Sequence, residues 1–409
     1  MSARHVTIIV PTRNRADTLR STLATCTMQD YEPLDILVSD NCSDDATPDV
    51  AAGTRDRRVR HVRTPRRLGM SQNWEFALGH VERGLVLVVG DDDGLLPDAV
   101  RDIASLLDET GCEAIAWREA KYRWRGWDGG DGGNTLRIPL RTGWRVESSD
   151  AALGRVLRGH SYRALPSLYW GAVDRAALTR ATARSGTYFH SLNPDVYSAF
   201  ATAMVVERFV WSERPYRING QSRHSTGVSF AKVDASDRSP RKLFLAEENL
   251  PFHHEYVLVP SPPVYVAEAY AQAREHVPGA NARPALDVAD VIEQMMGAAA
   301  ADGADAYALV ADGVREIARR AGRVAVGDRA IARHPHGAAA RRSGLARVLG
   351  RGLGRLSLTL NGDDFAVRDI HGASVLCHTV VRLFEADYLS PAGLARRVAR
   401  AVTSRLGAS

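Results

Sequence analysis

Four groups of polar or acidic residues follow predicted strands or open a predicted helix. They are Pro11–Arg15, Asp40, Asp91–Asp93 and Asp195. The first three come directly after hydrophobic segments, and Asp195 lies at the start of a helix pattern. In open α/β sheets, ligands bind outside the carboxyl ends of the strands. The sequence therefore predicts that these groups form one ligand site.

Asp91, Asp92 and Asp93 predict the chemistry of that site. Three adjacent carboxylates repel one another unless a positive charge lies beside them. Mg²⁺ and Mn²⁺ are suited to this position, because they take oxygen ligands and commonly bridge substrate phosphates. We therefore expect a divalent cation, Mn²⁺ or Mg²⁺, together with a phosphate-bearing ligand.

The first hundred residues alternate between strand and helix patterns. Continuous apolar runs predict buried strands at residues 6–10, 34–38 and 85–89, with a shorter strand at 59–62. Helical periodicity predicts helices at residues 16–28, 71–81 and 98–107, the second with Ser71 as its N-cap. This alternation is typical of an open, largely parallel α/β sheet.

The pattern is looser after residue 113. Strands are expected at residues 113–124, 167–171, 205–211, 215–219 and 365–383, and helices at 148–159, 172–183, 264–277, 285–300, 304–322 and 391–406. A helix is also expected to open at Asn193-Pro194-Asp195, with Asn193 as its cap. A polar break near residue 236 suggests two domains, residues 1–235 and a mainly helical part at 236–409.

Composition excludes several classes of protein. The chain has 409 residues, of which 45% are hydrophobic and 25% charged, as expected of a globular protein. The 53 Lys and Arg residues are scattered and nearly balanced by 48 Asp and Glu residues, so we expect no nucleic-acid partner. No apolar run is long enough to span a bilayer. Four cysteines without CxxC spacing suggest reduced thiols and a cytoplasmic protein, with peripheral contact at the inner membrane face as an alternative.

At this point the N-terminal part resembles a known family. Val6–Arg15, Val38–Asp45, Arg66–Asn73 and Val89–Asp93 are similar, in type and order, to the motifs of family 2 glycosyltransferases. The resemblance covers roughly residues 4 to 230. It implies the GT-A fold, a Rossmann-like mixed sheet flanked by helices, and a metal-dependent transfer of sugar from a nucleoside-diphosphate sugar.

The resemblance also implies roles for individual residues. Nucleotide-sugar contacts are implied for Pro11, Thr12, Arg13, Asn14, Asp40, Arg67, Asn73, Asp91 and Asp92. Arg67 would meet the diphosphate, and Asp40 the base or ribose. Asp93 is the first choice for direct metal ligation, supported by Asp91. Two alternatives stay open: Asp40 as a turn-forming residue and Asn73 as a packed polar residue.

Asp195 is the expected catalytic base. Inverting transfer needs a group that takes the proton of the acceptor hydroxyl, and the family carries a carboxylate in a segment similar to Asn193–Ser198. The alternative is an aspartate that favours the positive end of its helix. His224 lies in a segment that resembles the loop where some GT-A enzymes place a further metal ligand; a surface histidine is equally compatible. His253 and His254 are not expected to bind metal, because they lack the carboxylate context of a metal-binding motif.

The acceptor and the partners are less defined. A UDP-sugar is the expected donor, and a glycan, a lipid-linked glycan or a small molecule the acceptor. Tryptophans between Trp117 and Trp170 suggest a platform for the acceptor sugar, with core packing as the alternative. The C-terminal part would bind the acceptor or form a homo-oligomer. The rival functions are a nucleotidyltransferase and a catalytically silent binding protein with the same fold.

Overall fold

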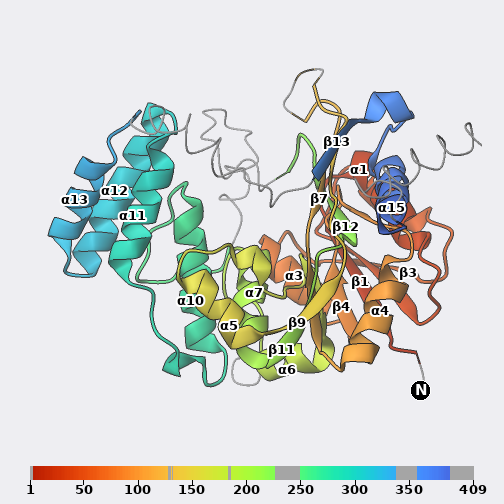
Figure 1. Ribbon diagram of the computed structural model, residues 1–409, viewed down its shortest axis with the longest axis horizontal. Coiled ribbons are helices and arrows are strands. Elements are labelled where there is room, and N and C mark those ends of the chain that lie inside the picture. Colours follow the sequence, from red (N-terminus) through yellow and green to blue (C-terminus); the bar gives the residue numbers. More distant parts are fainter. Residues whose placement is uncertain are drawn as a thin grey trace, which may run out of the picture.

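A mixed eight-stranded sheet forms the centre of the molecule (Figure 1). The structure is a computed structural model that describes residues 3–127, 130, 132–182, 186–225, 249–337 and 357–386. The strand order is β3-β2-β1-β4-β10-β6-β11-β9. These strands are β1 (Val6–Thr12), β2 (Leu34–Asp40), β3 (Val59–Arg63), β4 (Leu85–Val88), β6 (Ala114–Trp117), β9 (Trp144–Ser148), β10 (Gly171–Asp174) and β11 (Arg208–Ser212). The first four are parallel, and β10 runs antiparallel to both β4 and β6.

Helices cover both faces of this sheet. The strands carry apolar side chains on both faces, because successive residues point to opposite sides and both sets are apolar. Val6, Ile8 and Val10 of β1 join one core, whereas Ile9 joins the other. The first core is covered by α1 (Ala16–Thr27), α2 (Thr47–Ala52), α4 (Ala99–Thr110) and α15 (Ile370–Glu385). The second is covered by α3 (Met70–Leu78), α5 (Ser149–Leu157), α6 (Arg175–Thr182) and α7 (Pro194–Val205).

A smaller sheet of five strands stands beside the first. Its order is β13-β8-β7-β12-β5. The strands are β5 (Gly94–Leu95), β7 (Ala120–Arg123), β8 (Thr135–Pro139), β12 (Arg217–Gln221) and β13 (Ser357–Asn361). The chain leaves the first sheet at the end of β6 and enters the second at the start of β7, so residues 118–119 lie at the junction of the two sheets.

Four helices build a third core. They are α10 (Pro262–His276), α11 (Val288–Ala299), α12 (Ala304–Arg320) and α13 (Val324–Arg333), and they lie at one end of the molecule (Figure 1). Helix α10 also packs against α7, which joins this part to the main sheet. Short 3₁₀ turns occur at Tyr162–Ala164, Ala280–Ala282 and Gly362–Phe365.

The predicted fold class is confirmed: a mixed α/β sheet flanked by helices, followed by a mainly helical region. The expected boundary between residues 235 and 236 lies outside the described residues, as does the expected helix at 391–406, and the division at that point remains a prediction. Residues 357–385 return to the N-terminal sheets, because β13 pairs with β8 and α15 packs on α1.

Four local expectations were wrong. The helix expected from Ser71 begins at Met70 with Gly69 as its N-cap, and the Ser71 hydroxyl instead donates to the carbonyl of Ser191 at 2.6 Å. The strand expected at 365–383 is the helix α15. Its buried residues, including Ile370, Ala373, Cys377 and Val381, recur at helical spacing, although its β-branched residues favour a strand.

The other two concern β-structure. The single strand expected at 113–124 is two strands, β6 and β7, in different sheets. Of the residues expected to form a strand at 167–171, only Gly171 does so. It is the first residue of β10, which extends to Asp174. A side chain at Gly171 would come within 2.0 Å of the Ile115 carbonyl oxygen, so this strand pairing requires glycine.

Candidate active site

The loops that follow β1 and β2 are tied together at the carboxyl edge of the main sheet. Thr12 and Asp40 are register partners in the parallel pair, so the residues after them meet at one edge. Asn14 connects the two loops: its backbone N–H donates to the Ser43 hydroxyl at 2.9 Å, and its amide nitrogen donates to the Asp44 carboxylate at 2.6 Å. Asn14 has a φ of 55°, a conformation that asparagine tolerates better than most residues.

Asp40 lies beneath this edge rather than on it. Its side chain is fully buried, and one carboxylate oxygen accepts the Ser43 N–H at 2.9 Å. The other accepts from the Arg63 guanidinium at 2.6 Å. Asp40 therefore holds the loop after β2 in place, which matches the turn-forming alternative more closely than direct contact with a nucleotide.

Five further expected nucleotide contacts lie in different surroundings. Pro11 and Arg13 are partly exposed at the end of β1, while Thr12 between them is buried. Arg67 is exposed at the rim and pairs with Asp44 at 2.6 Å. Asn73 is buried on α3 and accepts the Ser39 hydroxyl at 2.8 Å, which fits a packed polar residue that fastens α3 to β2.

Asp93 is held inside the protein. Its side chain and that of Arg217 are both 0% exposed, and the guanidinium lies 3.1 Å from the carboxylate. The backbone N–H groups of Gly220 and Gly90 donate to its two oxygens at 2.7 and 3.1 Å. Burial raises the pKa of Asp93, and the charge of Arg217 opposes that rise. Both oxygens are thus engaged by the interior, which favours a structural role.

Asp91 and Asp92 lie closer to the surface of the edge. The Asp91 side chain is 13% exposed, 3.9 Å from the Arg15 guanidinium. Burial raises the pKa of Asp91, with Arg15 as the main opposing charge. Asp92 accepts hydrogen bonds from the hydroxyls of Ser222 and Ser225 at 2.7 and 2.6 Å, both to the same carboxylate oxygen.

The loop after β12 closes this side of the edge. Arg15 donates to the carbonyl of His224 at 2.5 Å and to the Ser222 hydroxyl at 3.4 Å. The His224 ring lies 3.5 Å from Asp17 of α1, and the structure gives it no contact with the three aspartates. Burial, with Arg15, lowers the pKa of His224 and favours its neutral form. The loop therefore meets the aspartates through its serines.

Asp195 lies in the first turn of α7, as expected, with Asn193 at the N-cap position. Burial raises the pKa of its carboxyl group, whereas the N–H of Val196 and the charge of Arg163 lower it. The net direction is upward, which makes the carboxylate a stronger base than an ordinary aspartate. The N–H contact also fits a helix-start aspartate, so the two interpretations of Asp195 are compatible.

A cavity of about 490 Å³ opens between the two sheets, α5 and the turn at residues 162–164. Its charged lining includes six cationic side chains and a single carboxylate: Arg118, Lys121, Arg137, Arg141, Arg155, Arg163 and Glu119. Three indole rings, Trp117, Trp170 and Trp211, complete its walls. Two of them belong to the predicted tryptophan platform, whereas Trp144 is exposed elsewhere and Trp124 donates to the Asp92 carbonyl at 2.9 Å.

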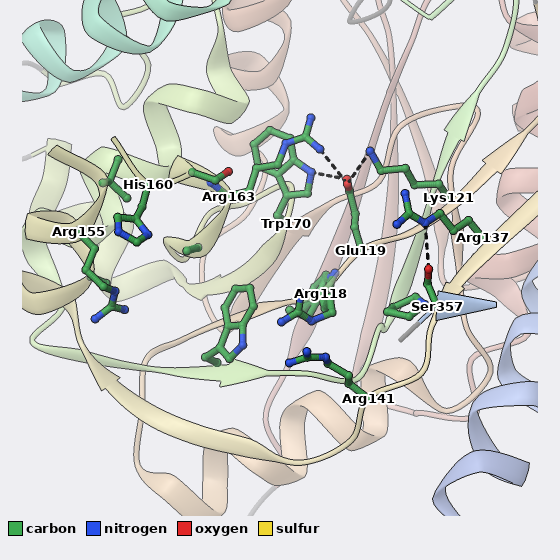
Figure 2. Close-up of a pocket in the computed structure, with 17 residues that line it drawn as sticks. Arg118, Glu119, Lys121, Arg137, Arg141, Arg155, His160, Arg163, Trp170 and Ser357 are labelled. Atoms are coloured by element: carbon green, nitrogen blue, oxygen red, sulfur yellow. Dashed lines mark hydrogen bonds and ion pairs between the residues drawn. The ribbon is translucent and has the colours of Figure 1, made fainter. Parts of the chain in front are cut away.

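Glu119 is the centre of this cavity, at the junction of the two sheets (Figure 2). It accepts from the indole of Trp170 at 2.6 Å and from Arg163 at 3.0 Å, and Lys121 lies 3.7 Å away. Arg217, the partner of Asp93, lies 4.0 Å from Glu119 on the other side. A chain of charges therefore connects the cavity with the aspartates.

Sequence reasoning missed Glu119, Arg163 and Arg217. No motif marks them, and each acquires its role only where distant segments meet. The one available signal was their position: Glu119 interrupts the predicted strand 113–124, and Arg217 lies in the predicted strand 215–219, where a buried charge needs a partner.

A second group of side chains could hold a metal ion, although the expectation that His253 and His254 bind none stays a prediction. Ligand atoms of these histidines and of Glu275 all lie within 4.8 Å of one another, and His253 Nε2 is 3.2 Å from the Glu275 carboxylate. The carboxylate comes from α10, more than twenty residues away in the chain, which is why the local sequence gave no sign of it.

Comparison with known proteins finds a family match in the N-terminal part of the chain. Residues 7–146 match the model of glycosyl transferase family 2. Over 108 residues the chain is 30% identical to the succinoglycan biosynthesis protein ExoO of Rhizobium meliloti (strain 1021), a match that covers 26% of this chain and 31% of that protein. The chain thus matches about a third of the length of this curated relative.

Two solved structures are similar at lower identity. TarS 1–349 of S. aureus, in complex with UDP-GlcNAc, has a TM-score of 0.49 at 16% identity over 78% of this chain and 84% of that chain. The mannosyltransferase PcManGT of Pyrobaculum calidifontis, in complex with GDP-Man and Mn²⁺, has a TM-score of 0.38 at 20% identity over 81% and 87% of the two chains.

Within the described part of the chain, no helix combines the length and the apolar character needed to cross a bilayer. The family match covers β1, β2 and β4 together with the loops that carry Asp40 and Asp91–Asp93. Residues 7–146, which carry these strands and loops, therefore match glycosyl transferase family 2.

Proposed function

We propose that this protein transfers a sugar from a nucleoside-diphosphate sugar to an acceptor hydroxyl, with inversion at the anomeric carbon and with the help of a divalent cation. The observation that carries the proposal is the pair Asp91 and Asp92, held at the carboxyl edge of β4 within a family 2 domain. A UDP-sugar is the first donor to test.

Asp92 and Asp91 are the side chains that we propose to hold the cation, in place of Asp93. Carboxylate oxygens suit Mn²⁺ and Mg²⁺, and the second oxygen of Asp92 accepts no hydrogen bond within the described residues. Asp93 is unsuited, because Arg217 and two N–H groups already engage its oxygens. A cation held here would neutralise the diphosphate as it leaves. His224 remains a candidate for an added ligand once a donor is bound.

The surrounding residues would bind and orient the nucleotide. Pro11, Thr12 and Arg13 form the floor at the end of β1, and Asn14 fixes the two adjoining loops. Arg67, at the exposed rim beside Asp44, would contact the diphosphate as a bidentate cation. Asp40 and Asn73 would contribute indirectly, because Asp40 holds the loop after β2 in place and Asn73 fastens α3 to β2.

Asp195 would act as the base. The acceptor oxygen attacks the anomeric carbon, the bond from that carbon to the diphosphate oxygen breaks, and the hydroxyl proton passes to the Asp195 carboxylate. The nucleoside diphosphate leaves with the bonding electrons. Burial supports this role, since it raises the proton affinity of the carboxylate.

We also propose a cytoplasmic site of action. All four cysteines, Cys26, Cys42, Cys112 and Cys377, are free thiols in the structure. Free and mostly buried thiols are typical of a reducing compartment.

The test is release of nucleoside diphosphate from UDP-, GDP- and dTDP-sugars in Mn²⁺, Mg²⁺ or EDTA. We expect one donor to be used, turnover to stop in EDTA, and Asp92→Asn to be inactive. Asp312→Asn, an exposed carboxylate on α12, is the matched control and should remain active. NMR of the product would establish its anomeric configuration. Full turnover in EDTA, or full activity of Asp92→Asn, would contradict the metal role, and retention of configuration would contradict inversion.

A further inference from the structure

We infer that the acceptor of this enzyme is an anionic carbohydrate, carrying phosphate or carboxylate groups close to the hydroxyl that receives the sugar, and that it binds in the cavity around Glu119. The inference rests on the proposed transferase function and adds the substrate class. It is drawn from the charge, the rings and the position of the cavity.

The charge of the lining is strongly positive. Six cationic side chains face one carboxylate, that of Glu119. Two further carboxylates, Glu147 and Glu213, pair with Arg155, Arg118 and Arg141 from outside the lining. Even with these included, cations outnumber carboxylates by two to one. A concave site of this sign concentrates anions and disfavours cations.

Arg137 is a cation with a neutral partner. Its guanidinium contacts the Ser357 hydroxyl at 3.4 Å, and Ser357 also lines the cavity. Arg155 and His160 lie on the opposite side, on and just after α5 (Figure 2). Guanidinium groups on facing walls match a ligand with anionic groups at more than one point, because each can form paired hydrogen bonds to phosphate or carboxylate.

The aromatic rings favour a carbohydrate over a small inorganic anion. Trp170 and Trp211 present apolar surfaces beside the charged groups, and Arg163 lies over the Trp170 ring at 4.9 Å. A volume of about 490 Å³ is in the range of ligand pockets and exceeds what a single phosphate needs. Flat apolar rings next to polar groups suit the mixed apolar and hydroxylated faces of sugars.

The position of the cavity connects it with transfer rather than with donor binding. Asp195 lies in the first turn of α7, which packs against the short turn at Tyr162–Ala164 beside the cavity, and its charge acts on Arg163 and Tyr162 of that turn. Ion pairs connect the cavity with the three aspartates at the proposed donor site: Glu119 lies 4.0 Å from Arg217, and Arg217 pairs with Asp93. A ligand in the cavity would thus bring a hydroxyl towards Asp195 while its anionic groups remain among the arginines.

Binding of defined oligomers to the full-length protein tests the inference. The probes are a glycerol-phosphate oligomer, a uronic-acid oligomer and a neutral glucan of equal length, followed by tryptophan fluorescence and calorimetry at several salt concentrations. We expect one of the two anionic oligomers to bind at least tenfold more tightly than the glucan, with affinity that falls as salt increases. Tighter binding of the glycerol-phosphate oligomer identifies phosphate as the recognised group, whereas tighter binding of the uronic-acid oligomer identifies carboxylate.

The variants Arg137→Gln and Arg155→Gln remove charge from opposite walls. Together they should weaken binding of the preferred oligomer by about tenfold or more, the equivalent of about 1.4 kcal/mol, and flatten its salt dependence. Arg315→Gln with Arg319→Gln, on the exposed side of α12, removes the same charge elsewhere and should leave binding unchanged. If the double variant does not fold, the same binding measurement is made with Arg137→Gln alone, which should also weaken binding of the preferred oligomer.

Donor turnover separates the inference from the function on which it rests. Slow release of nucleoside diphosphate without acceptor measures the donor site alone. If the donor is turned over but the glucan binds as tightly as the anionic oligomers, the inference is wrong and the transferase function stands. Equal binding of a single-stranded DNA oligomer would also overturn it, because general polyanion affinity would then explain the charge. If no donor is turned over yet arginine-dependent binding is found, the proposed function fails instead.

Discussion

Substitutions at the three adjacent aspartates should have different effects: we expect changes at the Asp93 pair to lower stability and changes at Asp92 to lower activity. Asp93 and Arg217 are fully buried and 3.1 Å apart. Replacing Arg217 by methionine leaves the Asp93 carboxylate buried without its cation, and breaking such a pair typically costs about 3–5 kcal/mol. Asp92, by contrast, is buried but accepts its hydrogen bonds from two neutral hydroxyls, and an asparagine oxygen can accept the same bonds. We therefore expect Asp92→Asn to change stability by less than about 1 kcal/mol.

The measurements are thermal and urea-induced unfolding followed by circular dichroism, paired with metal-dependent turnover of the same preparations. Arg217→Met should lower the melting temperature by about 10 °C, from about 2–4 °C per kcal/mol for a domain of this size. The double variant Asp93→Asn with Arg217→Met should regain part of the loss, because no charge is then left buried. The reasoning is refuted if Arg217→Met is as stable as the wild type, or if Asp93→Asn is fully stable but has lost its metal requirement.

Three further predictions address other sites. Asp195→Asn should lower the rate of transfer by at least about 100-fold, with donor affinity within twofold of wild type. Wild-type activity should decline as pH falls through the raised pKa of Asp195, because the base is then protonated. Unchanged transfer by Asp195→Asn would exclude Asp195 as the base. Burial raises the pKa of Glu268 from 4.5 to about 7, so its protonated form is favoured in the fold and wild-type stability should fall by about 3 kcal/mol between pH 4.5 and pH 7. Glu268→Gln should abolish this fall in urea unfolding, and an equal fall in the variant would exclude Glu268 as its cause. His253→Ala with Glu275→Gln should leave the metal requirement of transfer unchanged in a Mn²⁺ titration, and a shifted requirement would move the catalytic metal to that group.

Much of the sheet was predictable from the sequence, because buried parallel strands are continuous apolar runs. β1, β2 and β4 were located to within two residues, and the polar residues after them do gather at one edge. Helix α15 was not predictable in the same way. Its Val380 and Val381 favour a strand by residue type, and only their burial in the first core makes the helical spacing decisive.

The site was predictable only where residues close in sequence act together. Asp91, Asp92 and Asp93 look alike in the sequence, and burial alone distinguishes them. The partner of Asp93 is Arg217, more than a hundred residues away, and pairing at such a distance leaves no local pattern. The cavity has the same origin, because its walls come from segments between Trp117 and Ser357 that meet only in the folded chain.

The return of β13 and α15 to the first core has a consequence for the order in which the chain folds during synthesis. Helix α1 ends at Thr27, but α15, which packs on it, ends at Glu385. At about 5–20 residues per second, a ribosome needs roughly 20–70 s to make the intervening segment. For that interval the apolar face of α1 that α15 will cover is open to solvent and to chaperones, and it stays open after β11, the last strand of the main sheet in the chain, has been completed at Ser212.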